Sequence, residues 1–66
     1  MDKEKMIKDV ERYARMIARA DTEHCIEVFQ NQLDGYIQAV KTIYGEETAK
    51  EIKKHYTNKL MKLAGI

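Results

Sequence analysis

The sequence contains no proline and no tryptophan, and it has only three glycines, one phenylalanine and one cysteine among 66 residues. Proline and glycine are the residues that most often break regular structure, so few positions interrupt a helix. A single cysteine cannot form an internal disulfide, which excludes the disulfide-rich scaffolds of small secreted proteins. No apolar run approaches the length of about 18–20 residues that a membrane span needs. We therefore expect a cytoplasmic protein, without a membrane partner, whose fold depends on a hydrophobic core.

The short length limits the chain to one helical domain, which we expect to cover residues 1–66. A domain of about 60 residues buries only about 60% of the surface that its unfolded chain exposes, so its stability is small. The first five residues are not followed by an apolar segment, and we expect no secretory signal. Charged residues make up 35% of the chain but alternate with aliphatic ones, which favours a folded domain over disorder.

Apolar residues recur at intervals of three and four along the chain, which is the period of an amphipathic helix. The pattern predicts an all-α fold with helices near residues 3–20, 22–44 and 48–64, packed as a small antiparallel three-helix bundle. The most regular stripe belongs to the second helix, where it extends over nearly three heptads. The predicted core consists of residues on these stripes, namely Val10, Tyr13, Ile17, Ile26, Phe29, Leu33, Tyr36, Val40, Ile43, Ile52, Tyr56, Leu60 and Leu63.

Several residues match the signals that begin and end helices. Asp2 is suited to cap the first helix, and Gly45 follows the last apolar residue of the second, as a left-handed C-cap does. Thr48 and Glu51 have the spacing of a capping box, in which each side chain accepts a hydrogen bond from the other residue's amide. Gly65 is expected to end the third helix.

Small residues and the end of the chain add two packing predictions. Ile66 is expected to fold back onto Met61, the apolar contact that accompanies a glycine cap. Gly35 and Ala39 lie together on one flank of the second helix. A glycine inside a helix costs about 1 kcal/mol relative to alanine, so we expect Gly35 to allow the close approach of a neighbouring helix.

Segment 20–23 decides between two architectures. The stripe of the first helix and that of the second are out of phase there, and Asp21 or Thr22 is suited to cap a new helix, although no glycine or proline forces a turn. We predict a short turn. The alternative is one long kinked helix over residues 3–44, followed by a C-terminal helix, in a dimer that covers its apolar seam.

Charge is unevenly distributed, although the net charge is only +1. Residues 1–20 contain six bases and four acids, residues 21–45 contain one base and four acids, and residues 46–66 contain five lysines and three glutamates. The outer helices are therefore basic and the middle helix is acidic, which favours their packing. Five bases of the first helix recur at intervals of 3-4-3-4 opposite its apolar stripe, and we call them the basic ridge: Lys5, Lys8, Arg12, Arg15 and Arg19.

The basic ridge has two interpretations. It is about 21 Å long at about 1.5 Å per residue, and it is suited to bind an acidic protein surface or the phosphates of a nucleic acid. A solvated helix surface has the same pattern, because Glu4 with Lys8 and Glu11 with Arg15 form favourable i,i+4 pairs.

The residues that carry metal or catalytic chemistry are few. His24 and Cys25 are adjacent, so they point about 100° apart on a helix, and with His55 they do not supply the four ligands of a structural zinc site. No orienting group or glycine-rich loop accompanies Cys25 as a nucleophile. We predict no catalytic residues, no metal and no cofactor.

One segment of the second helix resembles a known family. Gln30-Asn31-Gln32-Leu33-Asp34-Gly35-Tyr36-Ile37 is similar to the Ser-Gln-x-Leu-Asp-x-Leu-Ile stretch of small two-helix aspartyl-phosphate phosphatases that regulate sporulation, with matches at Leu33, Asp34 and Ile37. The Ser and Gln of that pattern are Gln30 and Asn31 here, and the third helix is additional. The resemblance implies that Asp34 is the functional residue.

These observations favour a non-enzymatic helical adaptor or regulator that binds a macromolecule, with a protein as the expected partner. Small single-domain chains of this kind often come from phages or other mobile elements, which is an analogy at the level of the fold. The alternative is a nucleic-acid-binding protein that uses the basic ridge. A second alternative is the phosphatase-like sporulation regulator that the resemblance implies.

The apolar surface also favours self-association. The stripe of the second helix is wider than the narrow third helix needs, and Met16 lies off the stripe of the first. Small domains that cannot fill a core alone often pair, mostly as two-fold symmetric dimers. We therefore expect a homodimer whose interface includes Met16, Tyr36, Ile37 and Tyr44.

Overall fold

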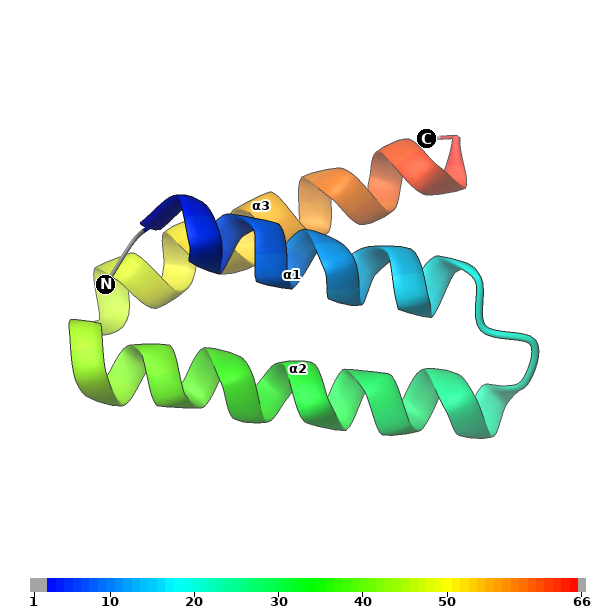
Figure 1. Ribbon diagram of the computed structural model, residues 1–66, viewed down its shortest axis with the longest axis horizontal. Helices are drawn as coiled ribbons and strands as arrows, with labels where there is room; N and C mark the ends of the chain where they lie inside the picture. Colours follow the sequence, from blue (N-terminus) through cyan, green and yellow to red (C-terminus); the bar gives the residue numbers. More distant parts are fainter. Residues whose placement is uncertain (1–2, 66) are drawn as a thin grey trace.

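The computed structural model describes residues 3–65, which form three α-helices joined by short connections. Helix α1 spans Lys3–Ala18, α2 spans Glu23–Tyr44 and α3 spans Glu46–Ala64. In Figure 1, α2 runs antiparallel to α1, and α3 returns across the far side of α1. The predicted all-α three-helix bundle is confirmed.

A turn separates α1 from α2, as predicted, and the single long kinked helix is wrong. Helix α1 ends at Ala18, two residues before the predicted end. The backbone of Thr22 is extended, with φ −134° and ψ 154°, and its Oγ1 accepts a hydrogen bond from the Cys25 amide at 3.2 Å. A threonine in this conformation caps a helix efficiently, so Thr22 begins α2 without the help of glycine or proline.

Gly45 alone connects α2 to α3. Its φ of 99° and ψ of 167° form a conformation that is open essentially only to glycine, and not the left-handed helical cap that was predicted. Its amide donates to the carbonyl of Lys41 at 3.0 Å, and its own carbonyl accepts from the amide of Ala49 at 3.2 Å. Helix α3 therefore begins at Glu46, and the predicted cap at Thr48 is wrong because Thr48 already lies inside the first turn.

Gly65 ends α3 in the left-handed helical conformation, with φ 78° and ψ 24°, as predicted. Its amide bonds to the carbonyl of Lys62 at 3.2 Å. The predicted cap at Asp2 and the predicted contact of Ile66 with Met61 involve residues outside the described range 3–65.

The buried core cluster lies where the first half of α1, the middle and second half of α2 and the first half of α3 meet, and α1 also buries Ala14 and Ile17. Ile52 and Val10 are completely buried there. The sequence-based core list omitted three buried residues, Met6, Ala14 and Ala49, although all three lie on the predicted apolar faces. Alanine is readily buried where helices lie close together, and α1 and α3 form the most extensive helix pair of the bundle. The buried core cluster consists of Met6, Val10, Leu33, Val40, Ala49 and Ile52.

Two residues of the predicted core are exposed instead. Ile43 is 69% exposed and Leu63 is 42% exposed. Both lie in the last turn of a helix. With 22 residues, α2 is longer than the 16-residue α1, and it extends past the described start of α1 in Figure 1. The apolar stripe therefore continues beyond the neighbour that would cover it.

The bundle opens toward the other end, because the second half of α3 moves away from α2 (Figure 1). Neither residues 23–32 of α2 nor residues 53–64 of α3 include a buried side chain. Ile26, Phe29 and Leu60, which face inward at this end, are only half-buried. We call residues 21–32 and 56–65 together the open end of the bundle.

Gly35 does not allow a close helix approach, and that prediction is wrong. Gly35 and Ala39 are both exposed, and a Cβ atom at position 35 would have no neighbouring atom within 4 Å. They lie on the side of α2 that faces away from α1 and α3, since Leu33 and Val40 are its buried residues.

Candidate functional site

The basic ridge lies on the outward side of α1. The helix buries Met6, Val10, Ala14 and Ile17 at helical spacing, and the ridge follows the opposite side. Four of its five bases are exposed, and Arg15 is half-buried. The exposed ones are Lys5, Lys8, Arg12 and Arg19. The predicted placement of these side chains opposite the apolar stripe is therefore observed.

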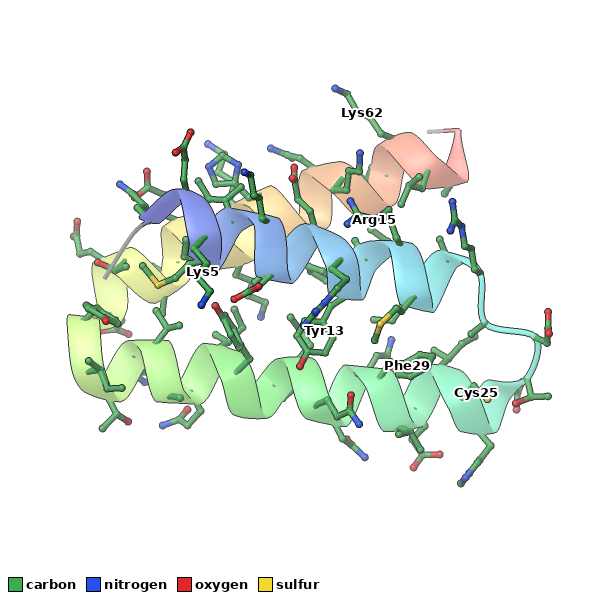
Figure 2. The ribbon with its side chains drawn as sticks, in the orientation of Figure 1. Lys5, Tyr13, Arg15, Cys25, Phe29 and Lys62 are labelled. Carbon is green, nitrogen blue, oxygen red and sulfur yellow. The ribbon has the colours of Figure 1, made fainter. Side chains whose placement is uncertain are left out.

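The ridge is not a straight row. In Figure 2, Lys5 extends from α1 toward α2, whereas Arg15 lies between α1 and the second half of α3. This agrees with helical geometry, which puts residues ten positions apart about 80° from each other around the axis. A partner that contacts the whole ridge therefore has to follow a curved path across α1.

Among residues 3–65, no ridge base has a side-chain nitrogen within 4 Å of a carboxylate oxygen. An ion pair does join Lys3 at the start of α1 to Glu51 on α3, and the hydrogen bond from Lys3 lowers the pKa of Glu51. Both of these side chains are about half exposed, so solvent screens the pair. Within residues 3–65, none of the five ridge charges is therefore neutralised by an ion pair.

A hydrogen bond anchors α1 to α2 beside the ridge. The Tyr36 hydroxyl donates to Oδ2 of Asp9 at 2.8 Å, and the Tyr36 and Tyr13 rings pack with their centroids 6.1 Å apart. Burial, the hydrogen bond and the charge of Asp9 raise the pKa of Tyr36 to about 12, although the nearby Arg12 opposes the shift. Since each ring contacts another helix, these tyrosines fix the rotation of α1 and so the direction of the ridge.

Asp34, the residue that the phosphatase resemblance implies, is exposed on α2. It lies close enough to Tyr56 on α3 that its charge, after burial, contributes to raising the pKa of the Tyr56 hydroxyl.

The four residues predicted for a dimer interface do not form one exposed surface. Tyr36 and Ile37 pack against the core of their own chain. Met16 is half-buried near the end of α1, and Tyr44 is partly exposed at the last residue of α2, toward the opposite end of the bundle. Five large apolar side chains are exposed among the described residues: Val28, Ile43, Tyr44, Met61 and Leu63. Val28 and Met61 lie off the apolar stripes that periodicity predicts.

The candidate metal ligands are not brought together. His24 and Cys25 lie in the first turn of α2, and His55 lies in the middle of α3. Within residues 3–65, no three His, Cys, Asp or Glu side chains form a group that could hold a metal ion. No helix in this range combines the length and hydrophobicity of a membrane span.

Comparison with protein-family models, with curated proteins and with solved structures gives no match to this chain.

Proposed function

We propose that the protein is a small non-enzymatic adaptor or regulator that binds an acidic surface of a protein partner through the basic ridge. The observation that supports this most strongly is the set of five bases on the outward side of α1, none of which has a carboxylate within 4 Å among residues 3–65. Guanidinium groups bind carboxylates with two parallel hydrogen bonds, and the ridge contributes three of them, at Arg12, Arg15 and Arg19.

A rigid helix favours this role. Helix α1 is held by its buried side chains and by the bond from Tyr36 to Asp9, so the backbone under the ridge is ordered before binding. Ordering a surface in advance reduces the entropy that association costs.

The charges around the ridge favour a protein over a nucleic acid. Glu4 and Glu11 project from neighbouring positions of the same helix, and the net charge of the chain is only +1. Duplex DNA presents about one charge per 1.7 Å, and proteins that bind it usually carry a strongly basic patch. A protein partner, with fewer and separated carboxylates, tolerates the acids beside the ridge. We also propose that the protein acts in the cytoplasm.

Site-specific photo-cross-linking in the cells that express the protein tests this proposal. A photoreactive side chain at Lys8, in the middle of the ridge, should cross-link one discrete protein. The matched control is the same side chain at Thr42, which is exposed on α2 away from α1. Arg12→Glu with Arg19→Glu should abolish the Lys8 product. Equal products from both positions would contradict a specific surface on α1.

Fluorescence anisotropy with a labelled DNA duplex and a labelled single-stranded RNA tests the alternative. Five phosphate contacts on a duplex would give a log–log salt slope of about −4.5. We expect no saturable binding at micromolar concentration. Tight binding with that slope, lost in the Arg12→Glu and Arg19→Glu variant, would make the ridge a nucleic-acid interface instead.

A further inference from the structure

We propose that the open end of the bundle is a dimer interface, in which the first half of α2 of one copy packs on the second half of α3 of another. This surface is separate from the basic ridge, and neither proposal depends on the other.

The open end leaves inward-facing apolar side chains without complete cover. Ile26 and Phe29 on α2 and Leu60 on α3 are half-buried, and Leu63 in the last turn of α3 is 42% exposed. In Figure 2, Phe29 projects from α2 toward α1 in the part of the bundle from which α3 has moved away. The stripes of α2 and α3 are buried further along, at Val40 and Ile52, so these two helices are incompletely covered at this end, although Ile17 of α1 is buried there.

Charge complementarity identifies a second copy of the chain as the occupant. Residues 21–32 contain three acids, Asp21, Glu23 and Glu27, and no lysine or arginine. Residues 56–65 contain two lysines, Lys59 and Lys62, and no acid. One copy therefore carries both complementary halves of the interface, each in the same stretch of chain as some of these apolar side chains.

Within one chain these opposite charges do not meet. In Figure 2, Lys62 projects from the second half of α3 to the outer edge of the molecule, away from α2. None of Glu23, Glu27, Lys59 and Lys62 has an ion-pair partner within 4 Å among residues 3–65. A two-fold axis at the open end would bring the acidic segment of each copy to the basic segment of the other, so the contact would form twice.

Two charge-reversal variants, measured separately and as a mixture, test this arrangement. The first variant carries Lys59→Glu and Lys62→Glu, and the second carries Glu23→Lys and Glu27→Lys. All four positions are exposed or half-buried, so both chains should keep their helical circular dichroism. Each variant alone should dimerise at least about tenfold more weakly than the wild type, because both contacts become repulsive. An equimolar mixture should recover the wild-type affinity as a heterodimer, because both contacts become attractive again.

Sedimentation equilibrium on the full chain, from micromolar to millimolar concentration, reads out the association. The wild type should rise from 7.7 kDa toward twice that mass. Lys50→Glu with Lys54→Glu, on the outward side of α3, is the matched control and should dimerise as the wild type does. A wild type that stays monomeric overturns the proposal. A mixture that fails to recover affinity overturns it as well, as does a control that is weakened equally.

Discussion

Removing one methyl group from Ile52 and from Ile43 should have very different effects, although the chemical change is the same. Ile52 is completely buried, whereas Ile43 is 69% exposed. A buried Ile→Val change costs about 0.5–1.5 kcal/mol, from lost burial and the space that remains. At about 0.05–0.15 kcal/mol per residue, the domain has about 3–10 kcal/mol of stability in total, so Ile52→Val should destabilise the protein without unfolding it.

Thermal unfolding followed by circular dichroism measures the difference. Since 1 kcal/mol shifts the Tm of so small a domain by about 4–8 °C, Ile52→Val should lower the Tm by about 2–12 °C. Ile43→Val should change the free energy of unfolding by less than about 0.5 kcal/mol, as surface substitutions usually do. All three chains must be compared at one protein concentration, because self-association raises the Tm. Equal losses for the two variants would refute the burial of Ile52 and the exposure of Ile43 on which this prediction depends.

The remaining predictions concern the helices and their caps. Gly35→Ala should stabilise the protein by about 0.4–1 kcal/mol, because nothing lies within 4 Å of the added Cβ; a loss of stability in urea would contradict this. Thr22→Ala should cost about 0.5–2 kcal/mol, since it removes the cap of α2, whereas Thr48→Ala should cost nothing measurable in the same titration. Tyr36→Phe should reduce the loss of unfolding free energy that the wild type shows between pH 10 and pH 12. The pKa of Tyr36 rises from 10.0 to about 12 on folding, so its contribution is complete below pH 10 and is lost as the pH rises toward 12. If the unfolding free energies of the wild type and Tyr36→Phe fall by the same amount over that pH range, the pKa of Tyr36 is not raised on folding.

Helical periodicity identified the buried side of each helix but not the length over which it is buried. The stripe of α2 is regular from Ile26 to Ile43, yet Leu33 and Val40 are its only buried members. Periodicity depends on one helix alone, whereas burial depends on where its neighbours end and diverge. Neither the opening between α2 and α3, where Leu63 lies, nor the extension of α2 past α1, where Ile43 lies, has a signature in the apolar pattern, so both residues were wrongly placed in the core.

Of the two connections between helices, the sequence predicts the first correctly but not the second. Thr22 was recognised as a possible cap because threonine and the change of stripe coincide there. At the second connection, the capping-box motif of Thr48 and Glu51 competed with Gly45, and the glycine determined the outcome. A single residue with φ 99° reverses the chain, so no linker remains for Thr48 to cap. The spacing of a capping box does not show whether a single glycine already connects the two helices.

The basic ridge was predictable because its residues share one helix, and charge spacing alone places them opposite the apolar stripe. The open end was not, because it combines residues 21–32 with residues 56–65, which only the tertiary fold relates. The segregation of charge between α2 and α3 was visible in the sequence, but its position next to uncovered apolar side chains was not.

Binding through the basic ridge is tested most directly by titrating the purified cross-linked partner with three forms of the chain. These are the wild type, Arg12→Glu with Arg19→Glu, and the charge-matched Lys50→Glu with Lys54→Glu, whose positions lie on the outward side of α3. If the ridge is the binding surface, the first variant weakens the affinity at least about tenfold, and the second stays close to the wild type. Equal losses in the two variants would show that net charge, and not the outward side of α1, determines binding.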